Sequence, residues 1–315
     1  MLVLFLTLES ACWAVQTIDT LRRSADQGDD QAQCHLGVRY YTGVGLKMNP
    51  IEAVKWLRKS ADQGNARAQY CLGVAYGDGV GVTKDLVESV KWYRRAADQD
   101  YASAQYNLGG VYSHGVGVTK DLVEAVKWYR KAAEQGDANA QYNLGASYLN
   151  GTGVKADIVE AAKWYRLAAD RGLAAAQFNF GVMCASGIVV EKNPVEAVQW
   201  YLKAADQGYA RAQFNLGMMY VDENGIKKDH FEAVKWFRKA AGQGMTEAQF
   251  NLGVEYEYGN GIEQDIVEAH AWYNIANAYG RAGAGPKRDL VEKKMTHEQI
   301  SEATKRAKEL MATIK

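Results

Sequence analysis

The chain has 315 residues, of which 48% are hydrophobic, 23% are charged and only three are prolines. This composition is typical of a folded chain with few loops and excludes extensive disorder. Lysine and arginine together number 37, as do aspartate and glutamate, so the formal net charge is zero. Because there is no basic excess to hold phosphates, we expect no nucleic-acid partner. No run of eighteen apolar residues is present, so we expect no integral membrane segment.

The first 14 residues form an apolar segment that has two interpretations. Leu2 to Leu8 is an apolar run, and Cys12-Trp13-Ala14 follows it. One interpretation is the remnant of a secretory signal that ends at Ala14, although Glu9 interrupts the segment and no basic residue precedes the run. The other is an N-terminal segment that covers the first helix.

A fixed period organises the rest of the chain. Seven tryptophans recur every 36 residues, and the dipeptide Ala-Gln recurs in the same step without insertion or deletion. A period of this length predicts stacked repeats, each too small to enclose a core alone. The tryptophans, which we expect to be structural, are Trp56, Trp92, Trp128, Trp164, Trp200, Trp236 and Trp272. The predicted repeats are residues 29–64, 65–100, 101–136, 137–172, 173–208, 209–244 and 245–280, preceded by a half-repeat helix in residues 15–28.

The repeat over residues 137–172 shows how each unit begins. Ala140, Leu144 and Tyr148 lie four residues apart, which predicts an amphipathic first helix. Gly145 lies beside Leu144, where the close approach of another helix requires a missing side chain. Further glycines then supply the connection to a second helix.

The second helix of each repeat has a clear predicted start. Asp157 and Glu160 have the spacing of a capping box, in which the Asp side chain accepts a bond from a first-turn amide and the Glu bonds back. Ala161, Trp164 and Ala168 follow on the expected buried face. Lysines and arginines on this helix are expected to form a solvated outer face. The capping spacing recurs at Asn49/Glu52, Asp85/Glu88, Asp121/Glu124, Asp157/Glu160, Asn193/Glu196, Asp229/Glu232 and Asp265/Glu268.

Residues 281–315 are expected to form a helical cap at the end of the stack. Thr296 has capping-box spacing to Gln299, which marks the start of a helix. The order of one helix around Asp289 to Lys294 and a second from Thr296 is what the resemblance to a repeat family, given below, implies for this segment. A polar face on the last helix would keep the open end of the stack soluble. The sequence thus predicts an all-α solenoid of seven 36-residue helix-turn-helix repeats with a C-terminal capping helix.

Three motifs together resemble the Sel-one-like repeat family, a relative of the tetratricopeptide repeat. They are A-x-x-x-L-G-x-x-Y, then G-x-G-[VLI], then [DN]-x-x-E-A-x-x-W-x-x-x-A-A-x-x-G. The resemblance covers residues 29–280 and extends into both flanks. It implies a right-handed α/α superhelix in which first helices line a concave groove and second helices lie outside. It also implies a role as an adaptor in protein complexes.

A column of five asparagines is the main candidate for ligand contact. Each follows an aromatic residue and lies off the buried stripe of the first helix. By analogy with tetratricopeptide domains, these amides would bond the main chain of an extended peptide, since an amide offers donors and an acceptor. The competing interpretation is that they bond between neighbouring first helices. The five are Asn107, Asn143, Asn179, Asn215 and Asn251.

Two further columns belong to the same expected groove. Aromatic residues beside the asparagines would stack on a ligand or else pack between helices; the candidates are Tyr106, Tyr142, Phe178 and Phe214. A variable column suggests a polar ligand with no dominant charge; it contains Asp78, His114, Asn150, Asp222 and Tyr258. Gln33 and its counterparts beside the packing alanines are interpreted as structural partners for neighbouring backbone.

No motif for catalysis is present. Ser-x-x-Lys, His-Glu-x-x-His and Gly-x-Ser-x-Gly are all missing. The five histidines fall at unrelated repeat positions and in the tail, so we expect no metal site. Cys34, Cys71 and Cys184 occupy three different repeat positions, which favours thiols over a repeated disulfide pattern. We expect no enzymatic activity and no cofactor.

These observations predict a monomeric, non-enzymatic adaptor or scaffold that binds a protein or peptide in the concave groove. Two alternatives remain open. One is a secreted hydrolase of the type that carries a penicillin-hydrolase label among cysteine-rich relatives, and the other is a secreted factor that acts on another cell. Because export is common among bacterial relatives, we favour a periplasmic or secreted location over the cytoplasm.

Overall fold

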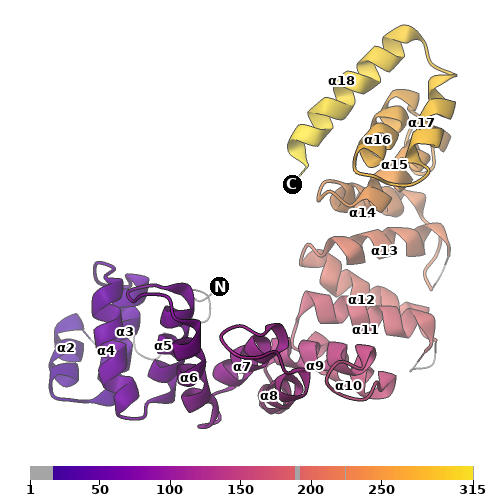
Figure 1. Cartoon of the computed structure of the whole chain (residues 1–315). Helices are drawn as coiled ribbons and strands as arrows, with labels where there is room; N and C mark the ends of the chain where they lie inside the picture. The colour runs from indigo at the N-terminus through magenta and orange to yellow at the C-terminus, as the bar shows by residue number, and fades with distance from the viewer. Residues whose placement is uncertain (1–16, 189–191, 224, 315) are drawn as a thin grey trace. The chain divides into compact units, whose positions relative to one another are not determined.

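The structure is a computed structural model that describes residues 17–188, 192–223 and 225–314. The apolar segment of residues 1–14 lies outside these ranges. All regular structure in the described part of the chain is α-helical, in 17 helices (Figure 1). The chain comprises two compact units, residues 1–164 (unit 1) and 165–315 (unit 2), and the division falls inside one helix, α10.

The helices follow the predicted order of a half-repeat, seven helix pairs and a cap. The half-repeat helix is α2 (Ile18–Asp26). The first helices are α3 (Asp30–Thr42), α5 (Ala66–Asp78), α7 (Ala102–His114), α9 (Ala138–Asn150), α11 (Ala174–Ser186), α13 (Ala210–Val221) and α15 (Thr246–Tyr258). The second helices are α4 (Pro50–Asp62), α6 (Leu86–Ala97), α8 (Leu122–Glu134), α10 (Ile158–Asp170), α12 (Pro194–Asp206), α14 (His230–Ala241) and α16 (Ile266–Ala278). The cap comprises α17 (Ala284–Glu292) and α18 (His297–Thr313).

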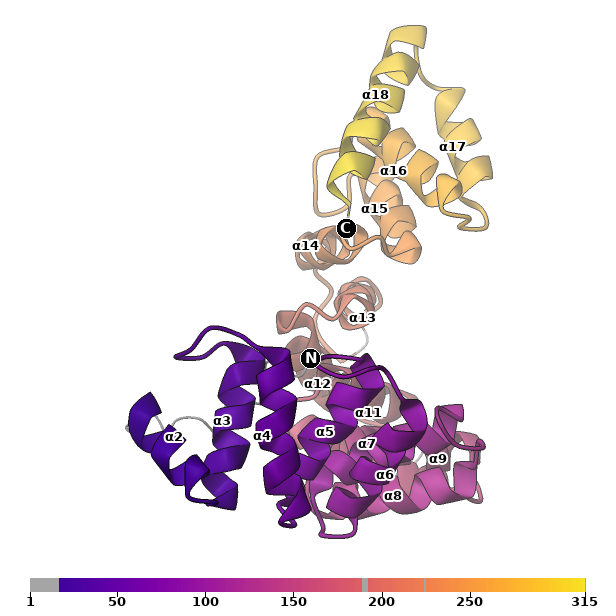
Figure 2. The same cartoon turned by 60° about the vertical axis from the view of Figure 1, so that its left-hand side comes forward.

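Within the repeats of each unit, each helix packs against the next one along the chain. In unit 1 the order α3, α4, α5, α6, α7, α8 and α9 is also the order of neighbours, and in unit 2 the same holds from α11 to α16 (Figures 1 and 2). This arrangement of helix pairs confirms the predicted solenoid.

The two helices of a repeat approach each other most closely at a glycine. A Cβ atom on Gly109 of α7 would lie only 2.6 Å from the ring of Tyr129 on α8, so no larger residue fits without movement. The predicted need for a missing side chain is therefore confirmed in this repeat. The same contact is made by Gly73 with Tyr93, Gly181 with Tyr201, Gly217 with Phe237 and Gly253 with Tyr273.

The tryptophans join successive repeats. Trp92 lies in one apolar cluster with Leu57 of the preceding second helix and Leu72 of its own first helix. Trp128 packs with Tyr93 and Leu108 in the corresponding places one repeat later. Because each of these two rings contacts two repeats, the core of unit 1 continues from one repeat to the next at these positions.

The start of each second helix differs from the prediction in one respect. The Asp85 side chain accepts a bond from the Glu88 amide, as expected. However, the Asp85 amide donates to the carbonyl oxygen of Tyr76 at the end of the first helix, at 2.9 Å. Glu88 therefore has no capping amide to bond and pairs with Lys91 instead, at 2.9 Å. The prediction that the glutamates bond back was wrong, because the first helix already satisfies the cap.

A ladder of buried glutamines on the first helices also connects neighbouring repeats. The Gln105 side chain donates to the carbonyl oxygen of Ala97 at 3.1 Å. Its own oxygen accepts a 2.7 Å bond from Gln135 of the following linker. Equivalent bonds to backbone are made by Gln33, Gln69, Gln141, Gln177, Gln213 and Gln249. The glutamines thus satisfy backbone carbonyls at helix ends, as the sequence indicated.

The cap begins earlier than predicted. α17 starts at Ala284, directly after Gly283, whose φ of +83° ends the preceding turn. Gly285 lets the new helix approach α16, since a Cβ there would lie 2.8 Å from the Asn277 side chain. In α18, Thr296 and Gln299 form the predicted capping box in both directions.

Two neighbouring glycines test the close helix contact. We expect Gly109→Ala to destabilise unit 1 by about 1–3 kcal/mol, because the added methyl group meets the Tyr129 ring. Gly110→Ala is the matched control, since its Cβ would lie 3.8 Å from the nearest atom, the Tyr129 hydroxyl. This control should raise stability by up to about 1 kcal/mol through helix propensity. Urea unfolding followed by circular dichroism measures both, and equal effects of the two substitutions would contradict the prediction.

Candidate functional site

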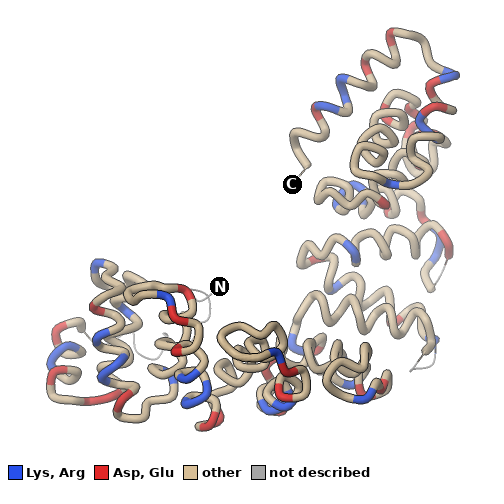
Figure 3. The backbone as a smooth tube through the Cα atoms, viewed as in Figure 1, with Lys and Arg blue, Asp and Glu red and all other residues tan. Residues whose placement is uncertain are grey.

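The first helices in the middle of the chain carry no formal charge. α7, α9 and α11 contain no Asp, Glu, Lys or Arg, whereas the second helix α8 contains five such residues. Figure 3 shows the contrast between α11, drawn without charged residues, and the alternating charges of α18. A ligand that lies along α7 and α9 therefore meets amides, hydroxyls and rings rather than ions.

The candidate aromatic residues are half-buried against rings of the second helices. Tyr106 lies tilted on Tyr129 with ring centroids 6.0 Å apart. Phe178 packs on Tyr201 at 5.9 Å and on Tyr209 at 5.3 Å. Phe214 lies 5.9 Å from Phe237 and Tyr142 is half-buried. Tyr106, Phe178 and Phe214 thus pack against rings of their own repeats, and Phe178 also packs against Tyr209 of the next repeat.

The candidate asparagines reach back to the preceding repeat. Burial raises the pKa of the Tyr70 phenol to about 12, and the hydrogen bond from Asn107 opposes this rise. Burial likewise raises the pKa of Tyr129, where Asn143 and Ser113 are the hydrogen-bond partners. Asn143 also bonds Tyr106, and Asn215 bonds Tyr201. Asn107, Asn143 and Asn215 therefore have phenols of the preceding repeat as partners, on first helices and on second helices alike.

The remaining two asparagines have different surroundings. Asn251 lies 3.1 Å from the sulfur atom of Met218, because the preceding repeat has Phe214 and Phe237 in place of tyrosines. Asn179 is half-buried in α11. An amide has two donor hydrogens and an acceptor oxygen with two lone pairs, so one or two bonds to phenols do not use its full capacity.

A hollow in unit 1 lies at Asn143. It has a volume of about 250 Å³ and is open to solvent. We call it the α7–α9 hollow, and its lining is Ser113, His114, Tyr129, Asn143, Ala146, Ser147, Asn150 and Thr152. The hollow brings together one member of the asparagine column with His114 and Asn150 of the variable column, which the sequence placed on the same groove.

Sequence reasoning missed an arginine contact on the second helices. Arg94 of α6 donates to the hydroxyl of Tyr112 on α7 and also lies 5.6 Å from the Trp128 ring. We call each such bond between repeats an arginine clamp. The clamps are Arg22–Tyr40, Arg58–Tyr76, Arg94–Tyr112, Arg130–Tyr148 and Arg238–Tyr256.

These arginines do not all belong to the solvated face that the sequence predicted. Arg58, Arg94 and Arg130 are half-buried, whereas lysines such as Lys91 are exposed. The constant spacing of 18 residues between arginine and tyrosine is the signal that could have revealed the clamp.

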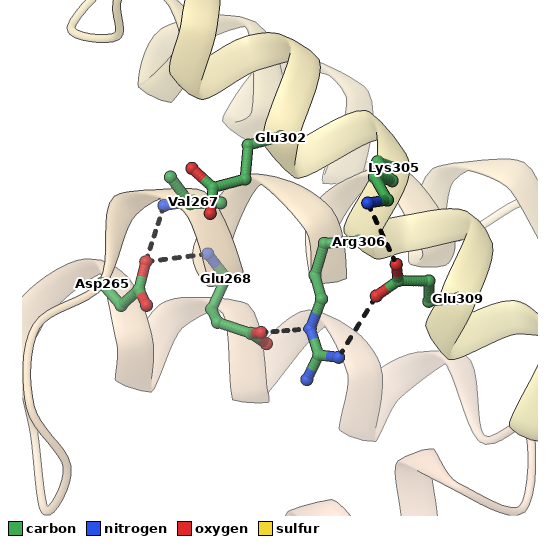
Figure 4. Close-up of a pocket in the computed structure, with 7 residues that line it drawn as sticks. All are labelled: Asp265, Val267, Glu268, Glu302, Lys305, Arg306 and Glu309. Atoms are coloured by element: carbon green, nitrogen blue, oxygen red, sulfur yellow. Dashed lines mark hydrogen bonds and ion pairs between the residues drawn. The ribbon is translucent and has the colours of Figure 1, made fainter.

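A second, larger hollow of about 510 Å³ lies between α16 and α18. In most other repeats the glutamate at this position pairs with a lysine three residues later. Ala271 replaces that lysine here, and Arg306 of α18 bonds Glu268 instead (Figure 4). Arg306 also pairs with Glu309 at 3.7 Å. The hydrogen bond to Glu268 raises the pKa of the Arg306 guanidinium. This network holds the cap on the last repeat.

A buried acidic side chain lies near the end of the stack. Glu255 on α15 is only 5% exposed and lies 2.8 Å from the imidazole of His230. Burial raises the pKa of its carboxyl, and His230 opposes the rise. Across the described ranges, no group of three metal-ligating side chains occurs. Nor does any helix there have the length and apolar character needed to cross a membrane.

The features described above are those of a known repeat family. The family described as Sel1 repeat matches residues 30–65, 66–101, 102–137, 138–173, 174–209, 210–245 and 246–278. The chain belongs to the Sel1 repeat family. Repeats of this family generally form non-catalytic scaffolds for protein–protein interaction. A comparison with curated proteins gives no match.

Two solved structures are similar to this Sel1 repeat chain. A Sel1 repeat protein from Oxalobacter formigenes has 36% identity and a TM-score of 0.68, covering 87% of this chain and 79% of its own. A protective antigen of uropathogenic Escherichia coli with an SLR fold has 30% identity and a TM-score of 0.59, covering 94% of this chain and 79% of its own.

The burial of the described cysteines predicts that their thiols react slowly. Cys34, Cys71 and Cys184 are buried, and burial raises the pKa of Cys71 to about 12 and that of Cys184 to about 11. At pH 8 a thiol with pKa near 12 is thiolate at only about one part in ten thousand. In a Cys12→Ser variant we therefore expect Ellman's reagent to react slowly until denaturant is added. Rapid reaction of one equivalent in the folded protein would contradict this.

Proposed function

We propose that this chain is a non-enzymatic adaptor that binds an extended, uncharged segment of a protein partner against the first helices of unit 1. The α7–α9 hollow carries this proposal, because it opens in the neutral first-helix surface at a residue of the asparagine column. Interaction with proteins is the general use of the repeat family.

The chemistry of the surface supports a peptide main chain as the ligand. An extended peptide presents unpaired amide and carbonyl groups, and burying them is favourable only where partners exist. Asn143 offers both donor and acceptor capacity beside the hydroxyl groups of Ser113 and Ser147. The absence of formal charge on α7 and α9 disfavours strongly charged segments, which would lose hydration without a counter-ion.

The half-buried rings are a second observation that supports the same proposal. Tyr106 packs against the Tyr129 ring with the Asn143 amide near its hydroxyl, which restricts its orientation before a ligand arrives. A fixed aromatic surface loses little conformational entropy on binding. The packing function of these rings is therefore compatible with ligand contact on their exposed edges.

The test must separate a direct contact of Asn143 from its bond to tyrosine. A displayed library of random peptides is selected on the wild-type protein, and the enriched peptide is synthesised with a fluorescent label for anisotropy measurements. We expect Asn143→Ala to weaken binding about tenfold, which corresponds to roughly 1.4 kcal/mol for a lost hydrogen bond. Tyr129→Phe removes the hydroxyl that Asn143 bonds and keeps the amide, and should change binding less than about threefold.

Two outcomes would contradict the proposal. If both variants weaken binding equally, Asn143 acts only by holding Tyr129 in place. If neither changes binding, the peptide lies elsewhere on the protein. Circular dichroism and urea midpoints of the variants show whether the fold is retained.

A further inference from the structure

Two neighbouring repeats carry unusually small residues at one helix position beside the α7–α9 hollow. Gly110 and Ala146 occupy this position in α7 and α9. The other repeats have larger apolar residues there, namely Val38, Val74, Val182, Met218 and Val254. A Cβ on Gly110 would have only the Tyr129 hydroxyl within 4 Å, at 3.8 Å, so the space beside it is open. The stack therefore lacks side-chain volume at one place in its first-helix surface.

The volume corresponds to a side chain rather than to a whole ligand. At about 250 Å³ the hollow is smaller than the range of roughly 300–1,000 Å³ found for small-molecule sites. Its lining contains no Asp, Glu, Lys or Arg. A charged side chain would be buried there without a partner of opposite sign, and an aliphatic one would leave polar groups unpaired, so both are disfavoured.

Hydrogen bonds already present determine what the lining still offers. The His114 Nδ1 atom lies 2.9 Å from the Gly110 carbonyl oxygen, which can only accept, so Nδ1 carries hydrogen. In the neutral ring, Nε2 is then an acceptor. The Ser147 hydroxyl donates to the main-chain carbonyl oxygen of Asn143 at 2.9 Å and keeps its acceptor lone pairs. Asn150 adds an exposed amide with donors and an acceptor.

We propose that the α7–α9 hollow binds one anchor side chain of the peptide, an uncharged group that both donates and accepts hydrogen bonds. The amide of Asn or Gln and the phenol of Tyr have this chemistry. Acceptors at His114 and Ser147 take the donor of the anchor, and the Asn150 amide provides donors for its oxygen. This inference rests on the proposed function, and it identifies which peptides the protein selects.

The experiment is a double-mutant cycle between the hollow and the peptide. Peptides selected on wild-type protein are synthesised with the anchor intact or replaced by Ala, and each is measured on wild type, Ala146→Met and Ala146→Ser. Methionine fills the hollow and already occupies the same helix position at Met218, whereas serine leaves the volume open. Asn150→Ala is a further variant at an exposed position, where folding is not in question.

We expect the selected peptides to share Asn, Gln or Tyr at one position. Replacing this anchor by Ala should weaken binding to wild type and Ala146→Ser about tenfold, and binding to Ala146→Met less than about twofold. Asn150→Ala should reduce the anchor's contribution by about threefold. Exchanging the anchor amide for a phenol in the synthetic peptide, and comparing the two affinities, shows whether the hollow prefers the side chain of Asn or Gln or that of Tyr.

The two proposals fail in different ways. If peptides bind and require Asn143, but show no coupling to position 146 or share a charged or aliphatic anchor, only the anchor inference is overturned. If no displayed peptide binds the wild-type protein, both proposals are overturned. An Asn150→Ala variant that keeps the full anchor effect also contradicts the anchor inference, because the amide would then make no bond to it.

Discussion

Because Gly109 has no side chain, the Tyr129 ring lies directly on the backbone of α7. From this position the ring packs on Tyr106 and bonds Ser113 and Asn143 through its hydroxyl. The same ring borders the α7–α9 hollow. The contact that brings the two helices of the repeat together therefore also places the side chains of the candidate site. A change in helix spacing at the glycine would move the ring and, with it, the phenol that orients the asparagine.

The fold could be predicted from the sequence because its determinants lie in fixed steps along the chain. The spacing of alanine, leucine and glycine predicts the first helix, and the Asp or Asn cap predicts the start of the second helix. The tryptophan period predicts the contact between successive repeats. The interactions of Glu88 could not be predicted in this way. A capping box assumes an unpaired amide at Asp85, and only the folded repeat shows that the Tyr76 carbonyl oxygen already takes it.

The candidate site was only partly predictable for a related reason. An asparagine off the buried stripe has the same local sequence whether it bonds a ligand, a tyrosine or both. Its partner depends on the preceding repeat, which offers phenols to Asn107 and Asn143 but a thioether to Asn251. The small residues beside the hollow, Gly110 and Ala146, lie in two different first helices and are 36 positions apart in sequence. A pattern within one repeat cannot reveal such a combination.

The arginine clamps have a mechanical consequence, because the series is interrupted twice in succession. Arg166 lies 5.6 Å from the Phe180 ring, and the residue 18 positions after it is Cys184 instead of a tyrosine. In the next repeat Leu202 replaces the arginine, 18 positions before Tyr220. A hydrogen bond across a joint resists sliding of one helix past another, since its energy falls steeply with misalignment. Apolar contacts alone are less directional. Under tension or torsion, the two joints without a clamp should yield before the joints at Arg94 and Arg238. We therefore expect resistance to deformation to differ between these places, although the repeats are all equally long.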